Sequence, residues 1–481
     1  MISDKKKELI FFGTLGGIIL VLVVMLIIVL VGNSKDKPGE SSALTSNNID
    51  SSLLERSELN SESIDDEDGS ETASGLSAVD SSSSSLSKND QESKDNSSSA
   101  VPVESGIKES STLNSSASGG DDMPEIPKVI DMKKYNLYTY SRPFWSGNTV
   151  YNESVYPMTT AGEENEIIQL LYDVDKILEV RSSDLKTLYK EGKDYKLQSG
   201  KLVIPSGSAI SVNKYNEYYL TQPLADHSQI RKGGGYIYFS EGGTFHNRQI
   251  AVSYKHKGIW GGKTLSKSGS KLPRLQKFIR DKQAVTIVYY GDSIAAGANA
   301  SSTFGGLPNT PKWTEMFSEY IQSLGAPVTQ YNSSVGGQIS TWGADNVAGR
   351  VNRYAPDLVV LAFGMNDSNS FNKNTPSVYK ANTKRTIEKI RATHPDAEII
   401  LVGTMLPNPE AEQFVGEQVA FLSKLYELEG EISGVAVADI TSVHEYLMTR
   451  KNYRDMTGNN VNHPNDFLSR VYLQVLIETI S

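Results

Sequence analysis

Five strand-like runs that alternate with helical patterns constrain the fold of residues 271–481 more than any other feature of the sequence. The runs lie at residues 286–290, 328–332, 358–363, 399–405 and 435–440. Patterns with a helical period lie at residues 312–324, 341–354, 376–393, 411–429 and 466–480. Strands that alternate with helices form βαβ units, in which helices cover both faces of a parallel sheet. We therefore predict an α/β fold for this region, with functional loops at the carboxyl ends of its strands.

The preceding region, residues 129–270, has a different pattern. Its short runs of strand-forming residues are separated by Gly and Ser turn signals, and they lie at residues 135–140, 177–180, 201–204, 236–239 and 249–254. Residues 183–189 also fit a short helix. Many short strands separated by turns are typical of an antiparallel sandwich. We predict a jelly-roll-like β-sandwich domain over residues 129–270, followed by the α/β domain over residues 271–481.

Residues 32–128 have the composition of a disordered segment. No aromatic residue occurs between Phe12 and Tyr135, and residues 33–120 contain 28 serines and 17 acidic residues but only 6 basic ones. A segment with this charge and so few apolar groups cannot offset the conformational entropy that folding would cost. We predict that residues 32–128 form a disordered stalk.

An uncharged run of 23 residues, 9–31, precedes the stalk. As a helix such a run is about 35 Å long, which exceeds the hydrocarbon core of about 30 Å. Lys5, Lys6 and Lys7 precede the run, and basic residues favour the cytoplasmic side. We predict a single-pass signal anchor in the cell membrane, with residues 1–8 as a cytoplasmic tail and the C-terminal domains outside the cell.

The charge and the absence of cysteine exclude several functions. The chain of 481 residues has a net charge of −10, and residues 33–120 alone carry −11. The rest of the chain therefore lacks the basic excess with which nucleic-acid binders displace counterions. Without cysteine there is no disulfide, no cysteine nucleophile and no thiolate zinc site. We predict no nucleic-acid partner, and the sequence sets no oligomeric state.

Polar residues and glycines follow successive predicted strands. Ser293 follows the first strand at a strand-to-helix turn, where the N-terminus of the next helix stabilises a nearby anion. Gly337 lies in the loop after the second strand, where glycines let backbone N–H groups approach a ligand. Asn366 follows the third strand, and its side-chain amide can donate to the same anion. His463 lies just before the last helix. Together these loops predict one site at the strand ends.

The sequence resembles the SGNH or GDSL hydrolase superfamily in its four blocks, which here hold Ser293, Gly337, Asn366 and His463. The resemblance covers residues 283–481. It implies a three-layer α/β/α domain of flavodoxin-like topology and a site that needs no metal or other cofactor. It also implies Ser293 as nucleophile, His463 as general base, and the Ser293 N–H, Gly337 and Asn366 as oxyanion-hole donors. The two-domain arrangement is similar to carbohydrate esterase family 2.

One block departs from the superfamily pattern. It is usually Asp-x-x-His, but here Asn460 stands three residues before His463. An amide leaves the imidazolium without its carboxylate partner. Three interpretations stay open: a Ser-His dyad in which a backbone carbonyl orients the ring, an orienting role for Asp455, or an inactive site. We favour the dyad because the other block residues are present.

Two further residues near these blocks are assigned from their positions. Asp292, beside the nucleophile, is expected to orient the nucleophile loop through hydrogen bonds. His444, at the start of a helical stretch, is expected to be structural and is the main rival to His463 as the base.

The sequence and the resemblance together predict an extracellular, membrane-tethered serine esterase. An enzyme on an outward stalk meets surface glycans, so O-acetyl esters on polysaccharide or peptidoglycan are the expected substrates, with small esters as an alternative. Two other functions stay open. One is a lipase or thioesterase, which would show a larger apolar groove for the acyl chain. The other is a surface glycan-binding protein whose catalytic site is vestigial.

Overall fold

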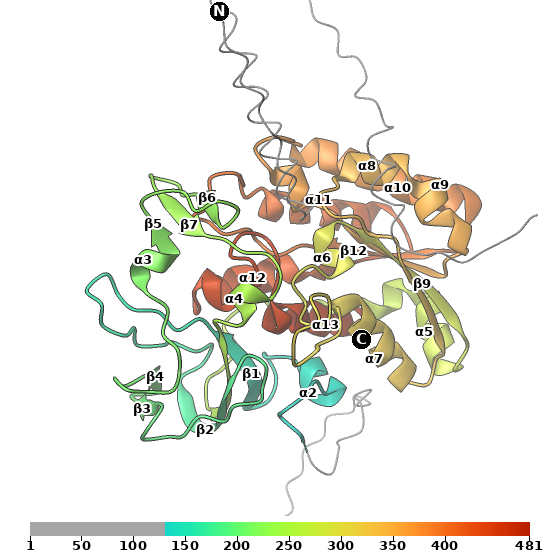
Figure 1. Cartoon of the computed structure of the whole chain (residues 1–481). Helices are drawn as coiled ribbons and strands as arrows, with labels where there is room; N and C mark the ends of the chain where they lie inside the picture. Colours follow the sequence, from blue (N-terminus) through green and yellow to red (C-terminus); the bar gives the residue numbers. More distant parts are fainter. Residues whose placement is uncertain (1–129) are drawn as a thin grey trace, which may run out of the picture. The chain divides into compact units, whose positions relative to one another are not determined.

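The structure is a computed structural model, and it describes residues 130–481 (Figure 1). The tail, the anchor and the stalk predicted over residues 1–128 lie outside the described residues and stay predictions. Among the described residues, no helix is both long and apolar enough to cross a membrane.

A parallel sheet organises the C-terminal part of the structure. Its strand order is β10-β9-β11-β12-β13, and every neighbouring pair of strands is parallel. The strands are β9 (Val285–Gly291), β10 (Val328–Asn332), β11 (Leu358–Ala362), β12 (Glu398–Gly403) and β13 (Val435–Asp439). All are nearly continuous apolar runs except the edge strand β10, which is largely exposed. The predicted parallel α/β fold is confirmed.

Alternate side chains along the central strands enter two separate hydrophobic clusters, one on each face of the sheet. In β9, Ile287 and Tyr289 enter one cluster, and Val288 and Tyr290 enter the other. One face is covered by α7 (Trp313–Ser323) and α13 (Asp466–Ile480), and the other by α8 (Ser340–Asp345), α10 (Pro376–Thr393) and α11 (Gln418–Glu431). Figure 1 shows these two groups of helices on opposite sides of the sheet. Because strand side chains alternate in direction, the sheet needs both layers.

The remaining helices of this part are short. They are α5 (Pro273–Arg280), α6 (Ser293–Ala296), α9 (Val347–Arg350), α12 (Ile440–Met448) and the 3₁₀ turns η3 (Gly269–Lys271), η4 (Asn352–Tyr354), η5 (Asn366–Ser368) and η6 (Tyr453–Asp455). Helix α12 agrees with the helical stretch that the sequence indicates at His444. It begins directly after β13, where the Asp439 side chain accepts a hydrogen bond from the Ser442 N–H and caps the helix.

Residues 130–260 form three small antiparallel sheets. The first has the order β1-β8-β2, with strands β1 (Thr149–Val155), β2 (Val174–Ser182) and β8 (Ile250–His256). The second pairs β3 (Lys196–Gln198) with β4 (Lys201–Val203), and the third has the order β5-β7-β6, with β5 (Tyr219–Leu220), β6 (Ser228–Ile230) and β7 (Tyr236–Tyr238). The short helices here are α2 (Leu137–Ser141), α3 (Tyr215–Tyr218) and α4 (Gly243–His246). The strands are antiparallel as predicted, but the predicted two-sheet sandwich is not shown.

Two local predictions in this region are wrong. Residues 135–140, predicted as a strand, overlap helix α2, because the Asn136 side chain accepts the Thr139 N–H and starts a helical turn. Residues 183–189, predicted as a helix, form a turn. There Leu185 has a left-handed φ of 61°, and the Ser182 side chain accepts the Thr187 N–H.

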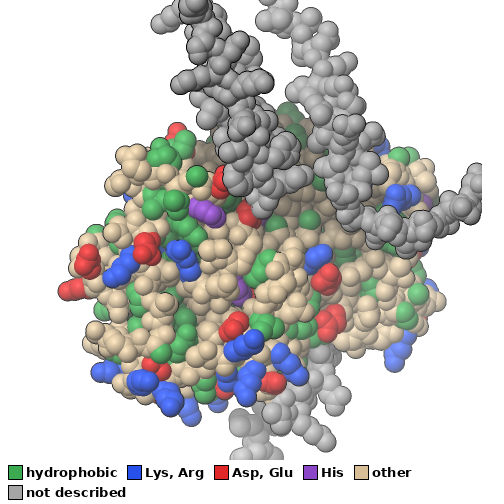
Figure 2. All heavy atoms as spheres, viewed as in Figure 1, with side chains coloured by type: hydrophobic (Ala, Val, Ile, Leu, Met, Phe, Trp, Pro, Cys, Tyr) green, Lys and Arg blue, Asp and Glu red, His purple; other side chains and the backbone are tan. Residues whose placement is uncertain are grey.

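The antiparallel region and the α/β region share one hydrophobic cluster. The two regions are also joined by a buried ion pair between Glu153 in β1 and Lys451 after α12, and both side chains are 0% exposed. On the surface, Lys and Arg side chains gather along the lower edge of the face in Figure 2, whose middle is mostly uncharged. The described residues lie within one compact unit, so the boundary at residue 270 stays a prediction.

Candidate active site

Ser293 lies at the tight turn between β9 and α6. A Cβ on Gly291, the last residue of β9, would collide with the Ala362 carbonyl oxygen of the neighbouring strand, so only glycine fits there. The Asp292 side chain accepts the Ile294 N–H at 3.0 Å and caps α6. This turn leaves the Ser293 side chain at the carboxyl end of the sheet and partly exposed.

The structure brings His463 into contact with Ser293, as predicted. The distance from His463 Nε2 to Ser293 Oγ is 2.9 Å, and His463 is only 8% exposed. The loop around His463 holds the histidine through hydrogen bonds to both its backbone carbonyl and its backbone N–H. Its carbonyl accepts hydrogen bonds from Thr457 Oγ1 and the Gly458 N–H, and its own N–H donates to Asn459 Oδ1.

Asn299 selects the tautomer of the neutral imidazole. Asn299 Oδ1 lies 2.7 Å from His463 Nδ1, while Asn299 Nδ2 donates to the carbonyls of Gly242 and Gly458, each at 3.2 Å. Since the amide nitrogen is committed to two acceptors, the amide oxygen faces the ring, and His463 Nδ1 carries the proton. Nε2 is then the lone-pair nitrogen, which is the form that accepts the proton of Ser293.

A second oxygen, from Glu241, faces the same ring nitrogen. Glu241 Oε2 lies 3.3 Å from His463 Nδ1, and Asn459 Nδ2 donates to Glu241 Oε1 at 2.9 Å. Burial alone would lower the pKa of His463, but the charge and hydrogen bond of Glu241, with a smaller contribution from Asp292, raise that pKa above its usual value. His463 therefore has a carboxylate near it although its sequence block lacks one.

Neither of the orienting residues considered from sequence contacts the ring. Asn460 Oδ1 accepts from the Tyr218 hydroxyl at 2.9 Å, and its Nδ2 donates to the Tyr238 carbonyl at 2.7 Å. Asp455 Oδ1 accepts the Tyr156 N–H at 2.7 Å. The prediction that a backbone carbonyl orients the ring is also wrong, because side-chain oxygens face His463 Nδ1 instead. The fully buried Asn460 and the buried Asp455 serve the packing between the two regions.

Two of the three predicted oxyanion donors, Gly337 and Asn366, lie on the loops after β10 and β11, the strands on either side of β9. A Cβ on Gly336 would lie 3.7 Å from the Ser293 Cβ, so this loop passes beside the nucleophile. The next residue, Gly337, has a φ of 75°, which favours glycine, and the space around it is open. Asn366 Nδ2 donates to the Gln338 carbonyl at 3.1 Å, which ties the Asn366 turn to the same loop.

Two buried carboxyl groups support these loops. Asp292 is 1% exposed, and burial raises its pKa to about 7 even though the Ile294 N–H and the charge of His463 act in the other direction. Asp367, at the Asn366 turn, accepts the Ser340 N–H and Asn374 Nδ2. The predicted role of Asp292 in orienting the nucleophile loop agrees with its bond to Ile294.

His444, the rival base, is placed away from the nucleophile. It is fully buried, its Nδ1 accepts the Leu406 N–H at 3.0 Å, and burial lowers its pKa to about 3. It therefore stays neutral and structural. Within residues 130–481, no group of three or more His, Asp or Glu side chains is arranged to hold a metal ion.

A comparison with known protein families finds a match that covers most of this site. Residues 289–469 match the family model of the GDSL-like lipases and acylhydrolases. The resemblance stated from the sequence is thereby confirmed for this part of the chain, which holds Ser293, Gly337, Asn366 and His463. Asn299 also lies inside the match, whereas Glu241 lies outside it. No curated protein matches the sequence.

Several solved structures are distantly similar. A two-domain esterase (CEX) active on acetylated mannans is 18% identical, with 45% of this chain and 53% of that chain covered and a TM-score of 0.36. TesA is 21% identical over 40% of this chain and 96% of that chain, with a TM-score of 0.32. A catalytic mutant of Axe2, an acetylxylan esterase from Geobacillus stearothermophilus, is 13% identical over 41% and 94%, with a TM-score of 0.35. This chain spans about half the length of the mannan esterase. At these scores the likeness carries no argument about activity.

Proposed function

We propose that this protein is a serine ester hydrolase in which Ser293 is the nucleophile and His463 the general base. One observation carries the proposal: His463 Nε2 lies 2.9 Å from Ser293 Oγ while its Nδ1 proton is committed to Asn299 Oδ1. A serine hydroxyl is a weak nucleophile by itself and needs a base in this position and tautomer. The match to an acylhydrolase family model over residues 289–469 supports the reaction class.

The proposed reaction has two halves. Ser293 Oγ attacks the ester carbonyl carbon as its proton moves to His463 Nε2, and a tetrahedral oxyanion forms. When the intermediate collapses, the imidazolium returns the proton to the leaving alcohol, and the acyl group stays on Ser293. Water then attacks the acyl-enzyme and gives its proton to His463. The acid is released, and the histidine returns the proton to Ser293.

The proposed oxyanion hole consists of the Ser293 N–H, the Gly337 N–H and the Asn366 amide. The Ser293 N–H is at the start of α6, where helix N–H groups have no partner inside the helix. The Gly336–Gly337 loop passes beside Ser293, and the bond from Asn366 to Gln338 holds the amide against that loop. Donors fixed before the reaction stabilise the developing charge without reorganising.

The proposed substrates are short acyl esters, chiefly O-acetyl groups on surface glycans. This assignment rests on the sequence: the predicted anchor over residues 9–31 and the predicted stalk over residues 32–128 would hold the enzyme outside the cell, next to such glycans. External protease on intact cells should then release a soluble, active fragment. Protection of the whole chain from that protease would contradict the orientation.

Turnover of p-nitrophenyl esters of increasing acyl length tests the proposed function. We expect fast turnover of the acetate, slow turnover of long acyl esters, and nearly complete loss of activity in Ser293→Ala and in His463→Ala. The exposed His227 provides a matched control, since His227→Ala should keep full activity. A preference for long acyl chains would favour the lipase or thioesterase alternative. No turnover of any ester would favour a vestigial site.

A further inference from the structure

We propose that Glu241 is a positioning residue for His463. Glu241 lies in the antiparallel region and supplies the carboxylate that Asn460 cannot provide. The inference rests on the proposed function, because it assigns a role toward the proposed base. It goes beyond the family match, since Glu241 lies before residue 289, where that match begins. The charge partner of the histidine thus comes from a separate region of the chain.

The loop that carries Glu241 is held against the histidine loop at several points. It runs from the end of β7 at Tyr238 to the start of α4 at Gly243. The Ser240 N–H donates to the Asn459 carbonyl, Asn459 Nδ2 donates to Glu241 Oε1, and the Gly242 carbonyl accepts from Asn299 Nδ2. These bonds leave Glu241 Oε2 as the carboxylate oxygen that faces His463 Nδ1 at 3.3 Å. The placement is therefore built by the fold, and a freely rotating side chain would not give it.

Asn299 and Glu241 divide the two tasks that one aspartate performs in a Ser-His-Asp triad. An aspartate selects the tautomer and also stabilises the imidazolium that forms during the reaction. Asn299 is neutral and, at 2.7 Å, is the nearer acceptor, so it selects the tautomer. Glu241 is farther away but charged, so it stabilises the imidazolium. With both tasks assigned, the site does not need the family aspartate at position 460. Asn460 there bonds to Tyr218 and Tyr238 instead of the ring.

Two carboxyl groups act on the charge of His463 from different elements. Glu241 acts from the β7–α4 loop and Asp292 from the end of β9. The Glu241 side chain is 53% exposed, so water screens its charge. Asp292 is buried, and burial raises its pKa to about 7, which disfavours its charged form. Removal of the Glu241 charge should therefore lower the pKa of His463 by a measurable but moderate amount.

The test is the titration of His463 in the full chain, followed by NMR of ¹³C-labelled histidine rings. The chain has six histidines, and the His463 signal is the one absent from His463→Ala. In Glu241→Gln we expect the titration midpoint of His463 to fall by about 0.5 to 1 pH unit. The acidic limb of kcat/KM should shift by the same amount, and kcat should fall about threefold to tenfold while KM stays constant.

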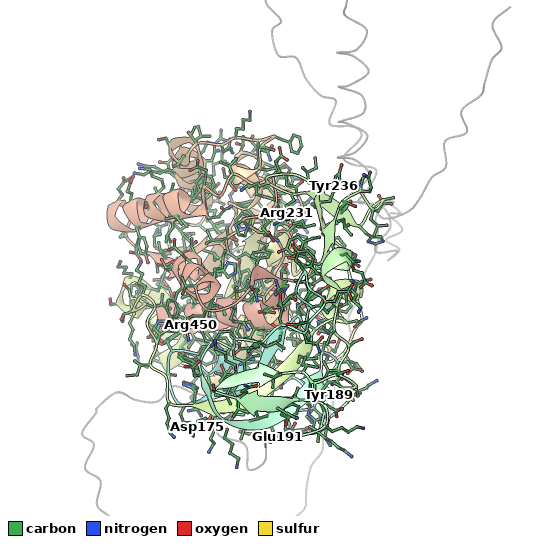
Figure 3. The ribbon with its side chains drawn as sticks, turned by 90° about the vertical axis from the view of Figure 1, so that its left-hand side faces the viewer. Asp175, Tyr189, Glu191, Arg231, Tyr236 and Arg450 are labelled. Carbon is green, nitrogen blue, oxygen red and sulfur yellow. The ribbon has the colours of Figure 1, made fainter. Side chains whose placement is uncertain are left out.

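Glu191→Gln is the matched control. It makes the same chemical change at an exposed glutamate of the antiparallel region. Figure 3 shows Glu191 at the opposite end of that region from Arg231 and Tyr236 on the hairpin that leads to Glu241. This variant should leave the titration midpoint and the kinetic constants unchanged. In the Glu241→Gln chain, the further substitution Asn299→Asp places a new carboxylate at His463 Nδ1. It should raise the titration midpoint of His463 again.

The two proposals fail in different ways. A midpoint in Glu241→Gln equal to that of the unmodified chain would overturn the role of Glu241, whatever the activity, because the titration needs no substrate. Unchanged turnover in Ser293→Ala would overturn the proposed function and leave the titration result intact. If Asn299→Asp does not raise the midpoint, charge at Nδ1 is not what sets it, and the inference is also wrong.

Discussion

The two regions of the structure contribute to the candidate site in different ways. The parallel sheet presents Ser293 after β9, Gly337 after β10 and Asn366 after β11, so three adjacent strand ends build one place for a reacting carbonyl. The antiparallel region contributes Glu241 through a loop at the back of His463. The α/β region therefore supplies the groups that would touch the substrate, and the antiparallel region sets the electrostatics of the base.

Side-chain packing joins the two regions next to the histidine loop. Phe144 in the antiparallel region stacks on Phe467 of α13 with 4.7 Å between ring centroids, and Arg470 of α13 lies over the Tyr140 ring at 4.4 Å. Helix α13 begins three residues after His463, so its position also fixes the histidine loop. This arrangement indicates that the antiparallel region is part of the folding unit of the site.

The largest expected effect is that of removing the antiparallel region. A fragment of residues 271–481 would expose the face of α13 that packs on Phe144 and would leave Lys451 without Glu153. We expect this fragment to show no cooperative thermal melt and no esterase activity, whereas residues 130–481 should show both. A fragment of residues 271–481 that melts cooperatively and turns over p-nitrophenyl acetate would show that the α/β region is an independent domain.

The next effect concerns the buried ion pair between the regions. Glu153 accepts from Lys451 Nζ, the Tyr254 hydroxyl and the Leu171 N–H, and Glu153 and Lys451 are fully buried. Glu153→Gln should lower the free energy of unfolding by about 3–5 kcal/mol, because it leaves the lysine charge buried without its partner. Chemical denaturation measures this value.

The exposed pair between Asp175 and Lys257 is the control for that measurement. Its side chains are 44% and 83% exposed, and Figure 3 shows Asp175 at the edge of the molecule. Asp175→Asn should lower the free energy of unfolding by less than about 1 kcal/mol. Equal losses in Glu153→Gln and Asp175→Asn would mean that the buried pair does not hold the two regions together.

A third effect distinguishes the proposed oxyanion donors, which follow the strands of the parallel sheet, from the proposed base His463. Asn366→Ala removes a proposed oxyanion donor, and kcat should fall about a hundredfold to a thousandfold, equivalent to about 2.7–4 kcal/mol of transition-state stabilisation. The pH at which activity rises should not move, since Asn366 does not contact His463. Steady-state kinetics across pH measures both quantities. A shift of the pH profile without a loss of kcat would contradict the assignment of the amide to the oxyanion.

The smallest effect concerns the position where the family aspartate is missing. Asn460 is fully buried, has a left-handed φ of 72° and bonds to Tyr218 and Tyr238. Asn460→Asp should lower the free energy of unfolding by about 1–3 kcal/mol, because the Tyr238 carbonyl loses its donor. The pH profile of the remaining activity should stay where it is. An upward shift of its midpoint would show that position 460 acts on His463 after all.

The sequence predicts the α/β region well because its signals are local. The predicted runs at residues 358–363 and 435–440 lie within one residue of β11 and β13, and the predicted helices at residues 376–393 and 466–480 coincide with α10 and α13. A buried parallel strand is a continuous apolar run, and a helix has its own period and caps. The positions of Ser293 and His463 follow once the strand ends are known.

The orienting groups could not be predicted in the same way. His463 and Asn299 are 164 positions apart in the chain, and His463 and Glu241 are 222 apart. Asn299 lies six residues after Ser293, in the loop after α6, where its left-handed φ of 62° is one that asparagine adopts more readily than most residues. Glu241 has no local signal, because its role depends on how two regions pack.

The most direct test of the account is to trap the nucleophile with diethyl p-nitrophenyl phosphate and to map the adduct by mass spectrometry. The phosphorus should bond to Ser293 Oγ as p-nitrophenolate leaves, because a hydrogen-bonded His463 accepts the serine proton. We predict one diethylphosphoryl group on the peptide that contains Ser293, no adduct in Ser293→Ala, and much slower labelling in His463→Ala. Esterase activity that survives in a chain labelled at a different residue, or not labelled at all, would contradict the account.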